Sequence, residues 1–123
     1  MPLKIDVSSL EGWFIKKRGP NKQKVLSILS SDTKRWFKVK ELVSYNRLEM
    51  ALCYYKTEHD LEARGWMYMR DIIDLRDNGD TITIVSLARS ITIEAKNRAV
   101  HELWFKSVSS LCPSLRNAAG QGQ

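Results

Sequence analysis

The chain has 123 residues, of which 43% are hydrophobic and 28% are charged, a composition typical of a single globular domain rather than of a disordered chain. Its formal net charge of +6 is uneven: residues 1–40 carry ten basic and three acidic side chains (+7), and residues 41–123 carry ten and eleven (−1). This basic excess predicts an anionic partner: nucleic acid, a membrane surface, or a phosphorylated or acidic protein. A membrane-spanning segment is excluded because no apolar run is long enough, and a signal peptide is excluded because the N-terminus lacks an apolar run.

The first strand is predicted over residues 11–18, where the sequence alternates around aromatic residues. Trp13 and Ile15 share one face of this segment, and Phe14 and Lys16 share the other. A period of two is typical of a β-strand. We therefore expect Phe14 to lie in the core and Lys16 to follow it on the same inward face.

The second strand is predicted over residues 35–43, after a long connection. A Gly-Pro-Asn break opens that connection, which runs over residues 20–33. Arg35 and Phe37 share one face of the strand, and we expect Phe37 to be a core residue. Arg35 is then the last inward side chain before the rim of the sheet.

The rest of the chain predicts further strands and one helix. Strands are expected over residues 49–56, 66–69, 72–75, 81–85 and 91–95. Two tight turns are indicated: one at Asn46-Arg47, and one at residues 77–80, where Asn78-Gly79 supplies the positive φ that a two-residue hairpin requires.

The C-terminal helix is predicted from an apolar stripe that ends before Pro113. The stripe consists of Val100, Leu103, Trp104, Val108 and Leu111. Asn97 is the expected N-cap, and Trp104 is an expected core residue.

These elements predict a mainly β fold. It is an antiparallel sandwich or barrel of seven short strands, with the helix covering one open end. The domain is expected over residues 9–112, with a flexible leader at 1–8 and a flexible tail at 113–123.

Five cations are expected to meet at one end of the first two strands. These are Lys16, Lys17, Arg18, Lys34 and Arg35. Because no acidic residue interleaves with them, an anion is the favoured occupant of the space between Lys16 and Arg35. The alternative is a solvated strand edge, where lysines block aggregation.

The connection itself combines charge with apolar residues. Lys22 and Lys24 are followed by Val25, Leu26, Ile28 and Leu29. Cations beside an apolar group suit a membrane interface, where the apolar side chains enter the acyl boundary. Two alternatives are a helical turn that packs on the barrel and a patch that binds a partner protein.

Catalytic and metal sites are not predicted. His59 and His101 lie far apart in sequence without spaced partner ligands, and no Gly-rich phosphate loop occurs. Cys53 and Cys112 form neither a disulfide framework nor a metal site, which indicates a reduced intracellular compartment. We therefore expect neither an enzyme nor a cofactor.

Several short motifs, in this order, resemble the pleckstrin homology (PH) family. Residues 12–16 (GWFIK) are similar to its first-strand G-W-L-x-K, and residues 34–37 (KRWF) to its second-strand K-R-W-F. Residues 52–56 (LCYYK) resemble L-x-Y-Y-K, and Arg64-Gly65 resembles the R-G before strand four. Trp104 resembles the tryptophan of the family's C-terminal helix. The subgroup that the chain resembles is the melted type, the ventricular zone-expressed PH proteins.

The resemblance implies a seven-stranded barrel capped by a helix and a module that binds phosphoinositide headgroups at the loop between the first two strands. Such a module is peripheral at the cytoplasmic face of the plasma membrane. The residues implied in headgroup binding are Lys16, Arg18, Arg35, Tyr55 and Arg64.

One departure from the family pattern leaves a second face open. Thr33 stands where the family's tight binders carry the middle cation of K-x(n)-[KR]-x-R. The alternative outer site consists of Lys17, Lys34, Lys22 and Lys24.

Two other functions compete with phosphoinositide binding. A protein-interaction module would use Val25–Leu29 and Trp66–Met69. Nucleic-acid binding is disfavoured, because Trp13, Trp36 and Tyr54 are spread among strands in core-like alternation rather than forming a stacking platform.

Overall fold

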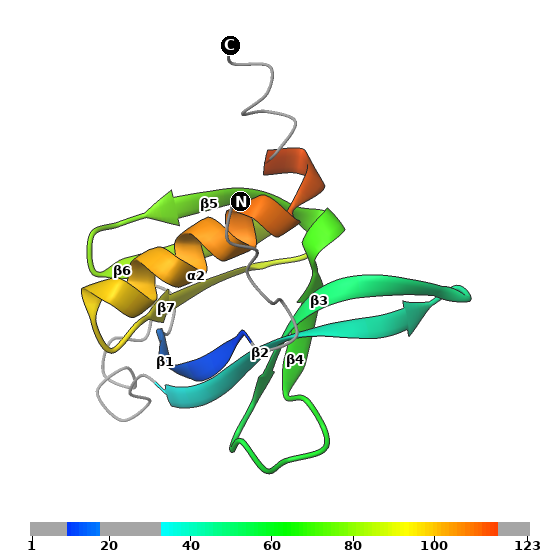
Figure 1. Ribbon diagram of the computed structural model, residues 1–123, viewed down its shortest axis with the longest axis horizontal. Coiled ribbons are helices and arrows are strands. Elements are labelled where there is room, and N and C mark those ends of the chain that lie inside the picture. The colour runs from blue at the N-terminus through cyan, green and yellow to red at the C-terminus, as the bar shows by residue number, and fades with distance from the viewer. Residues whose placement is uncertain (1–9, 18–32, 116–123) are drawn as a thin grey trace, which may run out of the picture.

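The computed structural model describes residues 10–17 and 33–115 (Figure 1). Seven strands, a 3₁₀ turn and a helix follow one another in these residues: β1 (Glu11–Lys17), β2 (Thr33–Ser44), β3 (Arg47–Tyr55), β4 (Gly65–Tyr68), η2 (Met69–Asp71), β5 (Ile72–Asp77), β6 (Thr81–Ser86), β7 (Ser90–Glu94) and α2 (Arg98–Leu111). The predicted order of seven strands and one helix is confirmed.

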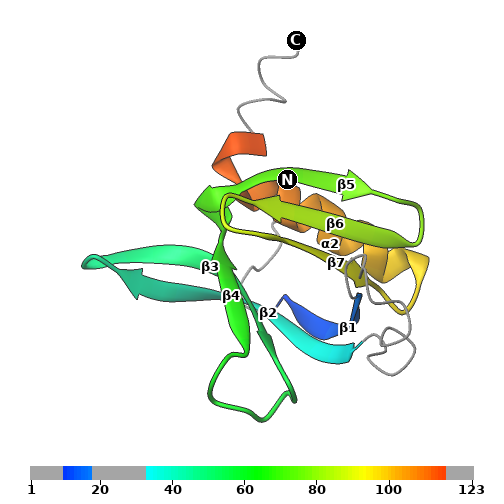
Figure 2. The same cartoon turned by 180° about the vertical axis from the view of Figure 1, so that it is seen from behind.

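All seven strands belong to one antiparallel sheet in the order β4-β3-β2-β1-β7-β6-β5. The sheet folds into two layers, β1–β4 and β5–β7, and α2 lies across the opening beside β5–β7 (Figures 1 and 2). Pairing between β1 and β7 joins the layers over only three residues of each strand, Ile15–Lys17 with Thr92–Glu94.

The core lies between the layers and is centred on aromatic residues. Phe14 and Phe37 are 1% and 0% exposed, as their alternation predicts. Their rings meet edge to face with centroids 5.5 Å apart, and Trp104 packs on Phe14 at 4.7 Å. This geometry suits the ring quadrupoles and ties α2 to the first layer of the sheet.

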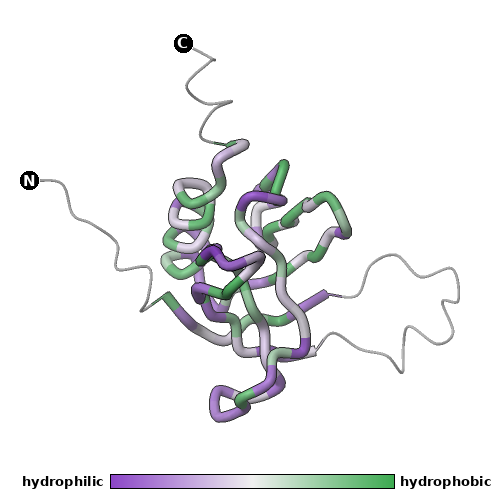
Figure 3. The backbone as a smooth tube through the Cα atoms, turned by 90° about the vertical axis from the view of Figure 1, so that its right-hand side faces the viewer, coloured by the Kyte–Doolittle hydropathy of each residue, from purple (hydrophilic) through white to green (hydrophobic). Residues whose placement is uncertain are grey.

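Helix α2 begins and ends where the sequence pattern predicts. The Asn97 side chain accepts a hydrogen bond from the Val100 N–H at 2.9 Å, as an N-cap should. Hydrophobic and hydrophilic residues alternate along the helix (Figure 3). Residues 113–115, expected in the tail, form a further helical turn, and Leu115 packs against the core.

Two turns differ from the prediction. The β2–β3 turn is centred on Tyr45 and Asn46, with φ of 51° and 64°, and therefore lies one residue earlier than expected. Three residues rather than two separate β5 from β6, and of these Gly79 takes the positive φ (96°).

The outer face of β1–β4 carries a second apolar cluster. Ala51, Cys53 and Tyr55 are buried there, beneath Trp36 and other partly exposed residues. Trp13 lies on this face too, edge-on to Trp36 with centroids 5.3 Å apart. Trp13 therefore lies on the face opposite Phe14, as alternation predicts, and the sheet has apolar residues on both faces.

Candidate functional site: a cationic cavity at one end of the barrel

Antiparallel pairing brings three chain connections to the same end of the barrel. β1 ends where β2 begins, β3 ends and β4 begins, as the pairing of β1 with β2 and of β2 with β3 requires. Lys17 pairs with Thr92 near the start of β7, so the β6–β7 turn lies at this end as well. The β2–β3 and β5–β6 turns lie at the opposite end.

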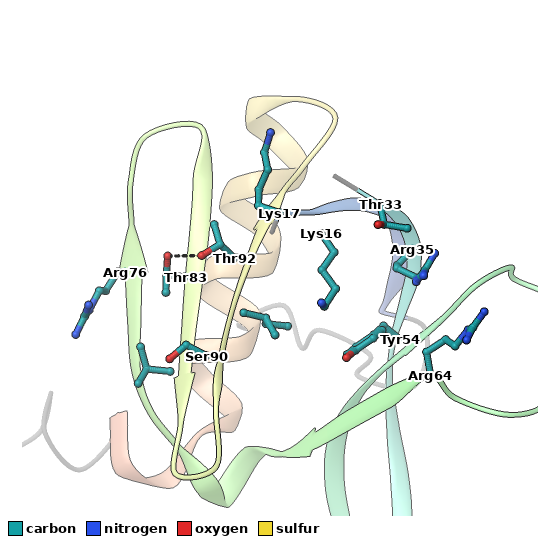
Figure 4. Close-up of a pocket in the computed structure, with 12 residues that line it drawn as sticks. Lys16, Lys17, Thr33, Arg35, Tyr54, Arg64, Arg76, Thr83, Ser90 and Thr92 are labelled. Atoms are coloured by element: carbon teal, nitrogen blue, oxygen red, sulfur yellow. Dashed lines mark hydrogen bonds between the residues drawn. The ribbon is translucent and has the colours of Figure 1, made fainter. Parts of the chain in front are cut away.

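A cavity of about 720 Å³ opens at this end and is lined by residues of both layers (Figure 4). The described residues that line it are Lys16, Lys17, Thr33, Arg35, Tyr54, Arg64, Arg76, Thr83, Val85, Ser90, Ile91 and Thr92. Five of them are cationic and none is acidic. Its volume is in the range of pockets that bind small molecules.

The five cations differ in their partners. Lys17 pairs with Glu94 at 2.8 Å and Arg76 with Asp74 at 2.8 Å, and both side chains point away from Tyr54 in Figure 4. Lys16, Arg35 and Arg64 lie on the Tyr54 side of the cavity, and no carboxylate in the described ranges forms an ion pair with them. Three cations thus remain available for an anionic ligand.

Tyr54 is the aromatic wall of the cavity. It is 6% exposed, and the Lys16 ammonium and the Arg89 guanidinium each lie 5.5 Å from its ring centroid. Cations over an aromatic face are attracted by its quadrupole, so the ring helps to hold Lys16 at the cavity. The Arg64 N–H donates to the Tyr54 carbonyl at 2.7 Å, which fixes the end of the β3–β4 connection relative to this wall.

Gly65 makes room for this arrangement. A Cβ atom there would lie 2.5 Å from the Tyr54 hydroxyl oxygen and 2.7 Å from an Arg89 Nη atom. Any larger side chain therefore displaces the wall. Both residues of the Arg64-Gly65 pair contribute to the cavity: Arg64 lines it, and Gly65 leaves space for the Tyr54 side chain.

Most residues expected at the inner site gather here, with one correction. Lys16, Arg35 and Arg64 line the cavity together. Tyr55 does not: it is 6% exposed within the outer-face cluster, where burial raises the pKa of its hydroxyl. Successive strand residues point to opposite faces, so Tyr54 takes the inward position. Arg18 lies outside the described residues.

Of the alternative outer site, only Lys17 and Lys34 are among the described residues. Lys17 lines the cavity and pairs with Glu94, whereas the Lys34 ammonium lies 4.9 Å from the Trp13 ring centroid on the outer face. The remaining residues expected in this site or in membrane insertion lie outside the described residues: Lys22, Lys24, Val25, Leu26, Ile28 and Leu29.

Tyr54, Arg76 and Arg89 join the site without having been predicted. The doublet Tyr54-Tyr55 carries no local signal for which ring points inward. Arg89 belongs to a short turn without a motif, and its place depends on contact with a strand that is distant in sequence. Arg76 reaches the cavity through the cross-strand row Arg76–Thr83–Thr92.

Other kinds of site find no support within residues 10–17 and 33–115. No group of three His, Cys, Asp or Glu side chains there could hold a metal ion. The buried His101 instead hydrogen-bonds Asp77 at 3.0 Å. No described helix combines the length and the apolar character needed to cross a bilayer.

An antiparallel sheet of seven strands, folded into two layers and capped by a C-terminal helix, is the fold of a PH domain. The chain has this fold. It is similar to the solution structure of the N-terminal PH domain of the ARAP2 protein from human, with a TM-score of 0.64, 17% identity, and coverage of 91% of this chain and 85% of that chain. No family model and no curated protein matches the sequence. The melted type remains a prediction.

Proposed function

We propose that this domain is a membrane-targeting module whose cavity binds the phosphorylated headgroup of phosphoinositides. The observation that supports this most directly is the group of Lys16, Arg35 and Arg64, three cations around one cavity without a described carboxylate partner. Three like charges at one cavity repel one another, and a polyanion relieves that repulsion. Peripheral association with the cytoplasmic face of the plasma membrane is part of the proposal.

The side chains suit phosphate groups on a polar ring. The two arginines offer forked donors to phosphate oxygens, and Lys16 offers a point charge. Thr33 contributes a hydroxyl where a further cation would increase affinity. We therefore expect a module of moderate affinity that relies on additional contacts with the membrane. The sequence-based candidates for those contacts are Arg18, Lys22, Lys24 and the apolar residues Val25, Leu26, Ile28 and Leu29.

Two binding assays with one pair of variants test the proposal. Titration with a soluble inositol polyphosphate measures headgroup binding, and co-sedimentation with vesicles that contain or lack phosphoinositides measures membrane binding. Lys16→Ala with Arg35→Ala should abolish both. Lys38→Ala with Lys40→Ala is the matched control, because it removes the same charge from β2 residues that do not line the cavity.

Two results of these assays would contradict the proposal. Equal binding to vesicles with and without phosphoinositides would refute the function. If Lys34→Ala abolished binding while the Lys16 and Arg35 double variant kept it, the outer site would replace the cavity. Binding should also weaken as salt rises, because the attraction is between charges.

A protein-interaction module is the second candidate, and the half-exposed Trp66 on the edge strand β4 favours it. Trp66 is 50% exposed, whereas Met67 and Met69 are 6% and 1% exposed. The surface expected at Trp66–Met69 therefore reduces to Trp66 and the partly buried Tyr68. A partner captured by the wild type and lost by Trp66→Ala, with vesicle binding absent, would favour this function.

A further inference from the structure

The β6–β7 turn presents a leucine to solvent on a well-fixed backbone. Leu87 is 72% exposed. The Ser86 N–H and hydroxyl both donate to the Arg89 carbonyl at 2.8 Å, and the Leu87 N–H donates to the Asp71 carbonyl at 3.0 Å. The turn thus holds Leu87 in place, although the side chain itself contributes little to the core.

This turn is continuous with the cationic cavity. Val85 and Ser90, on either side of it, line the cavity. The Arg89 guanidinium lies over the Tyr54 ring and donates to the Trp66 carbonyl at 3.4 Å, so it links the turn to the opposite wall. Leu87 therefore lies near the rim of the cavity, two residues before Arg89. No acidic residue occurs in the turn or within β7 before Glu94, and Asp71 meets the turn through its backbone carbonyl.

Two other exposed leucines differ from Leu87 in charge or in position. Leu61 is 94% exposed at the same end of the barrel, but it lies between Asp60 and Glu62, in a loop whose three carboxylates (with Glu58) outnumber its two cations, Lys56 and Arg64. Leu48 is 65% exposed and pairs with Val43 at the opposite end. An anionic membrane repels the acidic loop that carries Leu61. Leu48 lies at the end of the barrel that faces away from the membrane.

We propose that Leu87 enters the acyl boundary of an anionic bilayer when the cavity holds a headgroup, and that the acidic β3–β4 loop stays away from the surface. The domain then docks tilted, with the β6–β7 turn toward the membrane. This inference rests on the proposed headgroup binding and adds an anchor in a second loop to it. The turn is fixed before docking, so little conformational entropy is lost when Leu87 is buried.

The test compares serine variants of the three leucines on phosphoinositide vesicles. Leu87→Ser should weaken vesicle binding about tenfold, since leaving the leucine in water forfeits its burial. Leu61→Ser and Leu48→Ser should bind as the wild type does. Leu87→Ser should also bind a soluble inositol polyphosphate normally, because Leu87 does not line the cavity.

Each result of this comparison decides a different claim. Leu87→Ser with wild-type vesicle binding would overturn the anchor and leave the headgroup function standing. An equal loss for Leu61→Ser would overturn the tilt. A wild type that binds neither vesicles nor the soluble headgroup would overturn the proposed function and the anchor together.

A fluorescent label gives an independent readout of depth. Cys53 and Cys112 are both buried, so an environment-sensitive dye can be attached selectively at Leu87→Cys. Its emission should shift to the blue on phosphoinositide vesicles and not with the soluble headgroup. The matched label at Leu48→Cys should not shift. Equal emission from both labels on vesicles would contradict insertion.

Discussion

Replacing Gly65 with alanine tests the geometry of the cavity wall. The new Cβ would lie 2.5 Å from the Tyr54 hydroxyl oxygen, 2.6 Å from its Cζ atom and 2.7 Å from an Arg89 Nη atom. Arg89 is exposed and can move, but Tyr54 is 6% exposed and its ring lies 5.3 Å from that of Phe37. The clash must therefore be relieved by moving a packed aromatic ring.

The expected cost follows from two opposing effects. Overpacking of this kind costs about 1–3 kcal/mol. Loss of glycine flexibility in the unfolded chain offsets about 0.4–1 kcal/mol of that. We expect a net loss of about 1–2 kcal/mol, which lowers Tm by about 4–8 °C in a domain of this size. Affinity for the headgroup should fall as well, because Lys16 rests on the displaced ring.

Urea unfolding and thermal melting measure this loss, with Gly12→Ala as the matched control. Gly12 also lies in a strand, but a Cβ there would meet nothing closer than a Phe14 ring carbon at 3.9 Å. That variant should therefore keep or slightly raise the stability. In a Tyr54→Leu background Gly65→Ala should cost less, because the ring it strikes is gone. A Gly65→Ala protein as stable as the wild type in the native background would refute the close approach of Tyr54.

Two further predictions concern α2 and its surroundings. Asn97→Ala should cost about 1 kcal/mol in urea unfolding, because the Val100 N–H loses its side-chain acceptor. The pKa of Asp77 lies below its ordinary value of 3.8, because the carboxylate accepts the Gly79 N–H and also faces His101 and Arg98. Its stabilising effect is therefore present above the ordinary pKa of 3.8 and is lost as pH falls through the lowered pKa of the folded state. Asp77→Asn should be less stable than the wild type at pH 6, and the difference in urea unfolding should shrink as the pH falls below 3.8.

The parts of the fold that depend on local pattern could be predicted. Alternation around Phe14 and Phe37 identified two core residues and, through them, the inward direction of Lys16 and Arg35. The apolar stripe and Asn97 likewise placed the helix. These signals are local, because strand and helix periods depend only on neighbours in the sequence.

The parts that depend on distant contacts could not. Both faces of β3 are apolar: Leu52 and Tyr54 point into the core, and Cys53 and Tyr55 are buried in the cluster on the outer face of the sheet. Alternation in hydrophobicity therefore disappears, and nothing local shows which tyrosine reaches the cavity. The guanidinium of Arg89 similarly lies over the Tyr54 ring, which belongs to a strand distant in sequence.

Because β1 pairs with β7 over a short stretch, a ligand in the cavity also helps to hold the two layers of the sheet together. Only three residues of β1 pair with β7, and they lie beside the cavity. Its lining comes from both layers, with Lys16 and Arg35 from one and Ser90 and Thr92 from the other. A ligand that contacts both walls therefore stabilises the pairing of β1 with β7. Ligand occupancy and the slowness of amide hydrogen exchange along β1 and β7 become two measures of the same equilibrium.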